Sequence, residues 1–163
     1  MVIRKPLEPG HRRKLLVVID ETPECAKAVH FAALRAAHTS GALVLLYVIE
    51  RAAFQQWKGV ENIMRAEAVE AAETALGRFA DMVRNWAEIE PEQVIREGDT
   101  AVQVSELIDS DQDIAVLVLA TGSGGDGPGP LVSSLVGRSS PGFGVPVTIV
   151  PGSLNEATIA AIA

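Results

Sequence analysis

The stretch from residue 114 to residue 150 limits the fold of this chain more than any other. It opens with an uninterrupted apolar run, Ile114-Ala-Val-Leu-Val-Leu-Ala120, the pattern of a strand that is covered on both faces of a sheet. A glycine-rich segment follows at 121–130, a helix is expected from residue 131 to 138, and residues 145–150 form a second buried strand. Glycines let a backbone adopt positive φ and approach a ligand closely. A strand, a glycine turn and a helix in this order are typical of α/β proteins that hold phosphate on backbone N–H groups. A plain surface loop is the alternative interpretation.

The rest of the chain alternates apolar strands with helical segments. Thr22 followed by Pro23 is a helix-start signal, in which the threonine caps the helix and the proline occupies its first turn. Asp99 or Thr100 is expected to cap a later, shorter helix. The other strands are predicted at 14–19, 42–49 and 93–97, and the helices at 23–40, 61–86 and 99–108.

This alternation predicts an α/β fold with a parallel sheet, right-handed crossovers and helices on both faces. Ligands of such sheets lie beyond the carboxyl ends of the strands, at the point where the strand order reverses. If the strand order is 3-2-1-4-5, this point lies between strands 1 and 4. The loop at 20–23 and the glycine turn then meet at one crevice.

Helical periodicity predicts which faces are buried. In the first helix Cys25 lies on the inward face as a small buried hydrophobe, and His30 and His38 are expected on the surface. In the long helix the predicted apolar stripe consists of Met64, Ala68, Ala71, Ala75, Phe79, Met82 and Trp86. This stripe is interpreted as core packing and not as a cofactor groove.

Length and charge narrow the class of protein. A chain of 163 residues favours one domain, with a flexible N-terminal segment at 1–12, a single domain at 13–152 and a C-terminal tail at 153–163. The net charge of −7 argues against nucleic acid as a partner, and no apolar stretch is long enough to cross a membrane. The single cysteine excludes an intrachain disulfide and fits a reducing compartment. We therefore expect a cytoplasmic protein.

Several known catalytic and binding motifs are absent, incomplete or misplaced in this sequence. Gly122-x-Gly124-x-x-Gly127 matches the dinucleotide fingerprint in letters, but that fingerprint belongs in the first strand-to-helix turn and needs an acidic residue after the next strand. No P-loop motif occurs, and Ser123 lacks the preceding glycine of a nucleophile elbow. The three histidines show no metal-ligand spacing. A phospho-acceptor site at Asp20 and Glu21 is disfavoured because the residue before Pro146 is Val145 and not lysine.

The chain resembles the universal stress protein family from about residue 13 to residue 150. The matching features are Val-Val-Ile-Asp20 before a helix start, Leu-Leu-Tyr-Val48-Ile-Glu50 at the end of strand 2, Glu97-Gly98, the glycine turn, and the last strand at 145–150. The resemblance implies a five-stranded, doubly wound, Rossmann-like sheet of order 3-2-1-4-5, as in adenine nucleotide alpha hydrolases. It also implies a homodimer joined through the last strand, and ATP binding in some members.

The resemblance carries over a set of binding residues. Asp20 would meet the ribose, Val48 would lie beside the adenine, and the glycine turn would hold the phosphates on backbone groups of a G-x2-G-x9-G-[ST] motif. The candidate ligand-binding residues are Asp20, Thr22, Val48, Thr121, Gly122, Gly124, Gly127, Gly137, Arg138 and Ser139.

The turn departs from the family motif. Gly124, Gly127 and Gly137 have the motif spacing, but Arg138 replaces the Ser/Thr and Ser139 follows one position late. If Gly122 is matched to the first family glycine instead, the turn carries a two-residue insertion. Arg138 either contacts phosphate, which suits a guanidinium, or faces solvent.

Three functions are compatible with these features. The first is a regulatory module that binds ATP or AMP, with Mg²⁺ as an accompanying ion, and signals through a homodimer. The second is a dimeric interaction protein whose altered turn no longer binds nucleotide. The third is a slow ATPase, which is disfavoured because no general base or lysine for transition-state charge is evident, so we expect no catalytic residues. The tail is expected either to pack on a partner subunit, with Asn155 capping a helix, or to remain loose.

Overall fold

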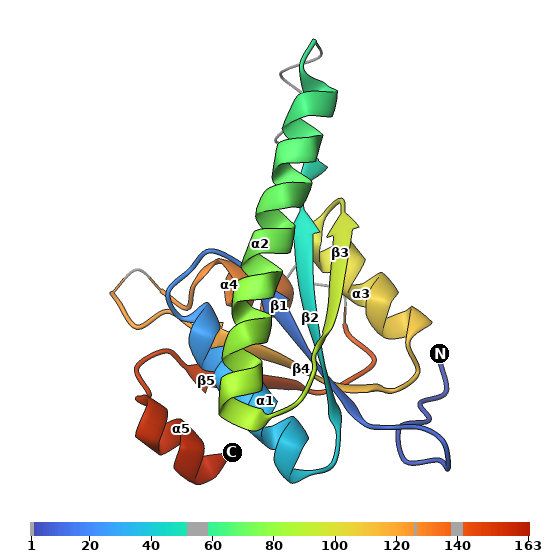
Figure 1. Cartoon of the computed structure of the whole chain (residues 1–163), viewed down its shortest axis with the longest axis vertical. Helices are drawn as coiled ribbons and strands as arrows, with labels where there is room; N and C mark the ends of the chain where they lie inside the picture. The colour runs from blue at the N-terminus through green and yellow to red at the C-terminus, as the bar shows by residue number, and fades with distance from the viewer. Residues whose placement is uncertain (1, 52–58, 126, 138–141) are drawn as a thin grey trace.

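The computed structural model describes residues 2–51, 59–125, 127–137 and 142–163. Its centre is a five-stranded sheet of order β3-β2-β1-β4-β5, in which every neighbouring pair is parallel (Figure 1). The α/β class and the strand order predicted above are therefore confirmed. The strands are β1 (Lys14–Ile19), β2 (Ala42–Ile49), β3 (Glu92–Glu97), β4 (Ile114–Thr121) and β5 (Val147–Pro151). The helices are α1 (Cys25–His38), α2 (Glu61–Ala87), α3 (Thr100–Ser110), α4 (Pro130–Val136) and α5 (Glu156–Ile162).

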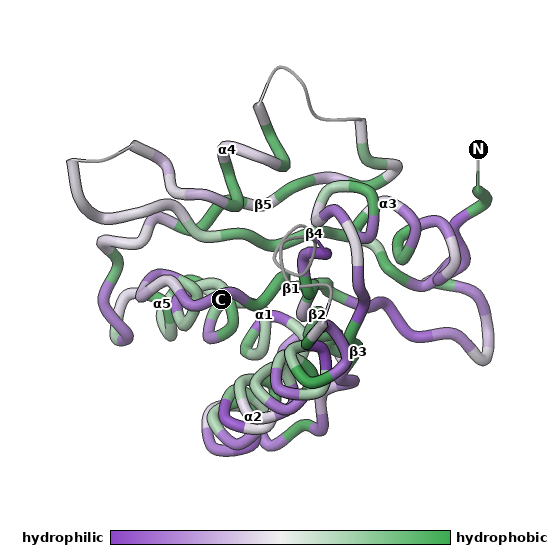
Figure 2. The backbone as a smooth tube through the Cα atoms, turned by 90° about the horizontal axis from the view of Figure 1, so that it is seen from above, coloured by the Kyte–Doolittle hydropathy of each residue, from purple (hydrophilic) through white to green (hydrophobic). Residues whose placement is uncertain are grey.

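Helices cover both faces of the sheet. Figure 2 shows α1, α2 and α5 on one side of the sheet and α3 and α4 on the other. Successive residues of a strand point to opposite faces. In β1, Leu15 and Val17 accordingly pack toward α1 and α2, whereas Leu16 and Val18 pack toward α3 and α4. The central strands are apolar without alternation because both of their faces are buried.

The last strand differs from its prediction. Residues 145–150 were expected as a buried strand, but β5 starts at Val147 and lies at the edge of the sheet. Ile149 is 40% exposed, whereas Val150 is almost fully buried. An apolar run therefore does not by itself distinguish an edge strand from a central one.

The first helix shows one confirmed face and two corrections. Cys25 is buried as predicted, on a face that also buries Ala28, Val29, Ala32, Ala33 and Ala36. His30 was expected on the surface, but it is buried because its ring stacks on Trp86 of α2 at a centroid distance of 4.3 Å. Thr22 does not cap α1, since its hydroxyl donates to Asp20 instead.

The predicted apolar stripe of the long helix α2 largely packs against the core. Phe79 is buried, and Met64, Ala68, Met82 and Trp86 are partly buried against core residues, whereas Ala71 is exposed. The buried residues of α2 also include four outside the predicted stripe, Ala72, Leu76, Ala80 and Val83. Figure 1 shows that the first half of α2 projects beyond the sheet and that the second half lies along it. Across the described residues, no helix is both long enough and apolar enough to cross a membrane.

The two terminal segments contact the domain. Arg4 donates from Nη1 to the carbonyl oxygens of Ile108 and Asp111, at 2.5 and 2.9 Å, at the end of α3. In the tail, Asn155 caps α5 by accepting a hydrogen bond from the Thr158 N–H at 2.8 Å, as predicted. Ile159 of α5 is fully buried, and α5 lies next to α1 of the same chain.

Candidate functional site

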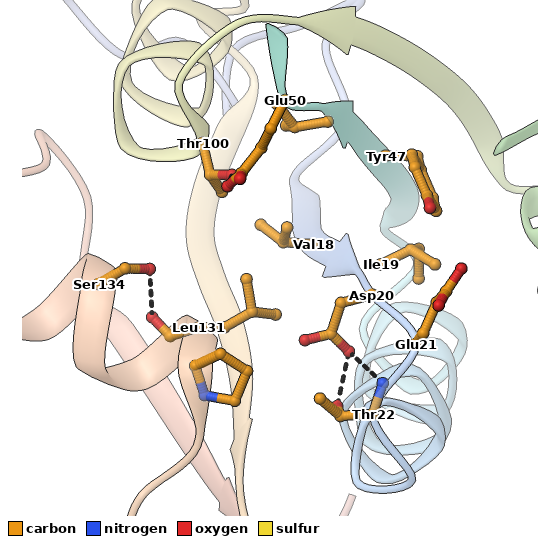
Figure 3. A pocket seen from close by; sticks show the side chains of 12 residues that line it. Val18, Ile19, Asp20, Glu21, Thr22, Tyr47, Glu50, Thr100, Leu131 and Ser134 are labelled. Atoms are coloured by element: carbon orange, nitrogen blue, oxygen red, sulfur yellow. Dashed lines mark hydrogen bonds between the residues drawn. The ribbon is translucent and has the colours of Figure 1, made fainter. Parts of the chain in front are cut away.

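A crevice of about 590 Å³ lies at the carboxyl end of the sheet, between β1, β2 and the helices α3 and α4. Its lining comes from the ends of neighbouring strands, the loop after β1, and the first turns of two helices. Figure 3 shows Asp20 and Leu131 facing each other across it, with Glu50 and Thr100 at one end. The crevice is lined by Val18, Ile19, Asp20, Glu21, Thr22, Tyr47, Val48, Glu50, Thr100, Pro130, Leu131 and Ser134.

Asp20 stands at the end of β1 with one carboxylate oxygen fixed. Its Oδ1 accepts hydrogen bonds from the Thr22 N–H at 3.0 Å and from the Thr22 hydroxyl at 2.6 Å. This two-residue ring orients the carboxylate, as aspartates at the start of turns commonly do. The second oxygen has no partner among the described residues and points into the crevice (Figure 3). It is therefore placed to accept a hydrogen bond from a ligand hydroxyl.

Acidic groups surround the crevice. The Thr100 hydroxyl donates to Glu50 Oε1 at 3.1 Å, which connects the end of β2 to the start of α3. The pKa of Tyr47 is raised by burial and, to a smaller extent, by the negative charges of Glu21 and Asp20. Among the described residues that line the crevice there is no lysine, arginine or histidine. The charged side chains of the described lining are therefore all acidic.

The glycine turn forms a second, smaller hollow beside the crevice, which we call the glycine hollow. It measures about 450 Å³, shares Pro130 with the crevice, and is lined by Pro23, Glu24, Gly122, Ser123, Gly124, Gly127, Gly129, Pro130 and Ser133. The turn is closed by a hydrogen bond from the Gly122 N–H to the Pro128 carbonyl at 3.0 Å. Gly127 and Gly129 have φ angles of +92° and +95°, a backbone conformation that residues other than glycine rarely adopt.

The predicted binding residues separate into groups. Asp20, Thr22 and Val48 line the crevice, and Gly122, Gly124 and Gly127 line the glycine hollow. Thr121 ends β4, and its hydroxyl accepts a long hydrogen bond of 3.4 Å from the Gly152 N–H. Gly137 follows the last residue of α4 and lines neither the crevice nor the glycine hollow. Arg138 and Ser139 lie outside the described residues.

Sequence reasoning missed several residues of the site. Tyr47 lies near the end of β2 and Glu50 directly follows this strand, whereas Leu131 and Ser134 belong to α4. Their signal was available, since they flank the carboxyl ends of strands in a parallel sheet. Glu24 had no such signal, because its contact with the glycine turn depends on how α1 approaches β4 and β5.

The described residues do not indicate a metal site or a reactive thiol. Within the described residues, no group of three or more histidine, cysteine, aspartate or glutamate side chains is arranged to hold a metal ion. Cys25 is 3% exposed, and burial raises the pKa of its thiol to about 12. The thiolate, the reactive form of cysteine, is thus strongly disfavoured.

Fold and site together define a class: a doubly wound α/β domain with a ligand crevice at the reversal of strand order. A model of the universal stress protein family matches residues 11–151. Because this match spans most of the chain, the protein belongs to the universal stress protein family. Members of this family are generally regulatory proteins and not enzymes.

Solved structures show the same fold. The universal stress protein UspA from Lactobacillus plantarum is 17% identical with a TM-score of 0.70, and the match covers 85% of this chain and 97% of that one. A universal stress protein in complex with cAMP is 17% identical with a TM-score of 0.60, over 86% and 98% of the two chains. One from Archaeoglobus fulgidus in complex with dAMP is 13% identical with a TM-score of 0.61, over 85% and 97%. Comparison with curated protein sequences gives no match.

Proposed function

We propose that this protein is a cytoplasmic regulatory module that binds an adenine nucleotide in the crevice and signals through a homodimer. The observation that carries the proposal is Asp20, whose free carboxylate oxygen points into a crevice that an apolar side chain, Val48, also lines. Pockets that bind small molecules combine such an apolar wall with a few placed polar groups.

The volume and the surroundings of the crevice suit a nucleoside moiety. Its 590 Å³ is within the range of ligand pockets in proteins, and the adjoining glycine hollow offers room for a further group. Two structural neighbours were solved with cAMP and with dAMP, which supports an adenine compound as the ligand here. Any Mg²⁺ would arrive with the phosphates of the ligand, because no protein metal cluster is formed by the described residues.

The proposed mechanism is binding without turnover. The described lining holds carboxylates but no lysine or arginine that would stabilise the charge of phosphoryl transfer. We therefore assign the crevice to a regulatory ligand, and we assign signalling to a dimer that forms along the exposed edge of β5. The cytoplasm is proposed because the chain has a single cysteine that remains a buried thiol.

The test is calorimetric titration of nucleotide-stripped protein with ATP, AMP and cAMP, with and without Mg²⁺. We expect micromolar affinity for at least one of them. Asp20→Ala should abolish this binding while the thermal unfolding transition is retained. Glu106→Ala is the matched control, because Glu106 is an exposed acidic residue of α3 that lines neither the crevice nor the glycine hollow.

Two results would contradict the proposal. One is an absence of heat and of thermal shift with all three ligands in the parent protein. The other is an unchanged affinity in Asp20→Ala, which would locate the ligand elsewhere.

A further inference from the structure

The side chain of Glu24 reaches into the glycine turn. Its Oε1 lies 2.8 Å from the position that a Cβ on Gly129 would occupy and 3.7 Å from the corresponding position on Gly122. Its Cβ lies 3.2 Å from the Cβ position of Gly152, just after β5. The carboxylate is therefore packed between glycines of two loops, and a larger residue at 129 would displace it.

No described cation pairs with this carboxylate. No hydrogen bond or ion pair of the Glu24 side chain is formed with any described residue. Glu24 also immediately precedes the first residue of α1, a helix of 14 residues, and the partial positive charge of a helix N-terminus stabilises a carboxylate there. A negative charge is thus held at the wall of the glycine hollow.

One backbone donor of the turn is also engaged within the turn. The Gly122 N–H is already bonded to the Pro128 carbonyl, so this donor is not available to a phosphate oxygen. The crevice next to it carries Asp20, Glu21 and Glu50. Each phosphate added to a ligand would bring further negative charge toward these carboxylates, and the repulsion grows with the charge of the ligand.

We propose that Glu24 is a specificity-determining residue that restricts the ligand to an adenine nucleoside with at most one phosphate group. This inference rests on the proposed function of the same crevice and specifies its ligand class. It predicts that the protein binds AMP more tightly than ATP when no divalent cation is present.

The test is titration of the parent protein and of Glu24→Gln with adenosine, AMP and ATP in the presence of a chelator. The glutamine keeps the size of the side chain and removes its charge. We expect the parent protein to bind AMP more tightly than ATP, and Glu24→Gln to improve ATP binding about tenfold, with a smaller change for AMP. A factor of this size is expected when one unit charge near another is removed at a partly solvated site.

The matched control is Glu106→Gln, which changes the net charge equally on an exposed face of α3. It should leave the ratio of the ATP and AMP dissociation constants unchanged. Raising the salt concentration should reduce the discrimination by the parent protein more than the discrimination by Glu24→Gln, because the variant keeps only the other carboxylates near the ligand.

The outcomes separate this inference from the proposed function. If the parent protein binds ATP as tightly as AMP, or if Glu24→Gln keeps the parent's preference, the role of Glu24 is overturned while nucleotide binding stands. If adenosine, AMP and ATP all fail to bind both proteins, the proposed function is overturned together with it.

Discussion

At the scale of residues, buried polar groups and crevice groups have opposite roles. Asp20 and Glu24 lie beside ends of secondary-structure elements, at the crevice and at the glycine hollow. His30 is inside the core, stacked on Trp86, and its Nδ1 has no partner among the described residues. A buried polar atom without a hydrogen bond costs free energy, and the cost rises if the group becomes charged.

This burial predicts a dependence of stability on pH. Burial lowers the pKa of His30 below its ordinary value of 6.5. The negative charge of Glu156 opposes this shift to a smaller extent, and the positive charge of Lys27 adds to it. At a pH above 6.5 the His30 imidazole is neutral in both the folded and the unfolded chain. As the pH falls below it, the unfolded chain takes up a proton and the folded chain does not, so the free energy of unfolding decreases.

Urea unfolding between pH 7.5 and about 5, above the range in which carboxylates titrate, measures the effect. His30→Gln should flatten the decrease, and His38→Gln should not, because His38 is exposed. Equal slopes in the parent protein and in His30→Gln would show that His30 does not couple folding to protonation.

At the scale of elements, the first residues of the chain act on α3. The last carbonyl groups of a helix lack partners within the helix. Arg4 supplies hydrogen bonds to two carbonyls at this end, those of Ile108 and Asp111, and its side chain is only 19% exposed. The Lys5 N–H adds a bond to the Gln112 carbonyl at 3.0 Å.

Arg4→Ala should therefore lower the free energy of unfolding by about 1 to 2 kcal/mol, the loss expected for two partly solvated hydrogen bonds from a charged donor. Lys5→Ala is the control, because the bond of Lys5 comes from its backbone, and we expect a change of at most about 0.5 kcal/mol. Chemical denaturation of both variants provides the comparison. Identical midpoints for the two would mean that the segment does not stabilise α3.

At the scale of the whole molecule, the free edge of β5 is the surface for the proposed homodimer. Among the strands that the structure describes, only β4 pairs with β5, and Ile149 is 40% exposed. The Leu117 N–H bonds to the Pro146 carbonyl, so Pro146 faces β4. Because backbone groups of a parallel strand alternate between its two neighbours, Thr148 also faces β4 and the N–H of Ile149 faces outward.

Ile149→Pro should consequently convert a dimer into a monomer, since proline removes an outward donor. Ile149→Val retains the donor and serves as the control. Thr148→Pro would instead disturb the pairing of β5 with β4 and destabilise the fold. Sedimentation velocity over a range of concentrations measures the association, and a parent protein that is monomeric throughout would refute the dimer.

Much of the fold could be predicted from local patterns. The apolar run 114–120 predicted β4, and Asp99 was one of two caps proposed for α3, which its bond to the Val102 N–H at 3.0 Å confirms. The place of the candidate crevice followed as well, because Asp20 and the glycine turn follow strands whose carboxyl ends meet. Glu24, Glu50 and Tyr47 did not follow, since their roles depend on which loops and helices lie beside them.

The sequence by itself determined the order of strands and helices and the residues that share a face, because these depend on the periodicity of apolar side chains along a few turns of chain. Only the tertiary structure decided which neighbour covers each face. The buried residues of α2 include Ala72, Leu76, Ala80 and Val83, which the apolar periodicity did not single out, and β5 is partly exposed because no described strand lies beyond it. Glu24 reached the glycine turn for the same reason: residues far apart in sequence become neighbours only when the sheet assembles.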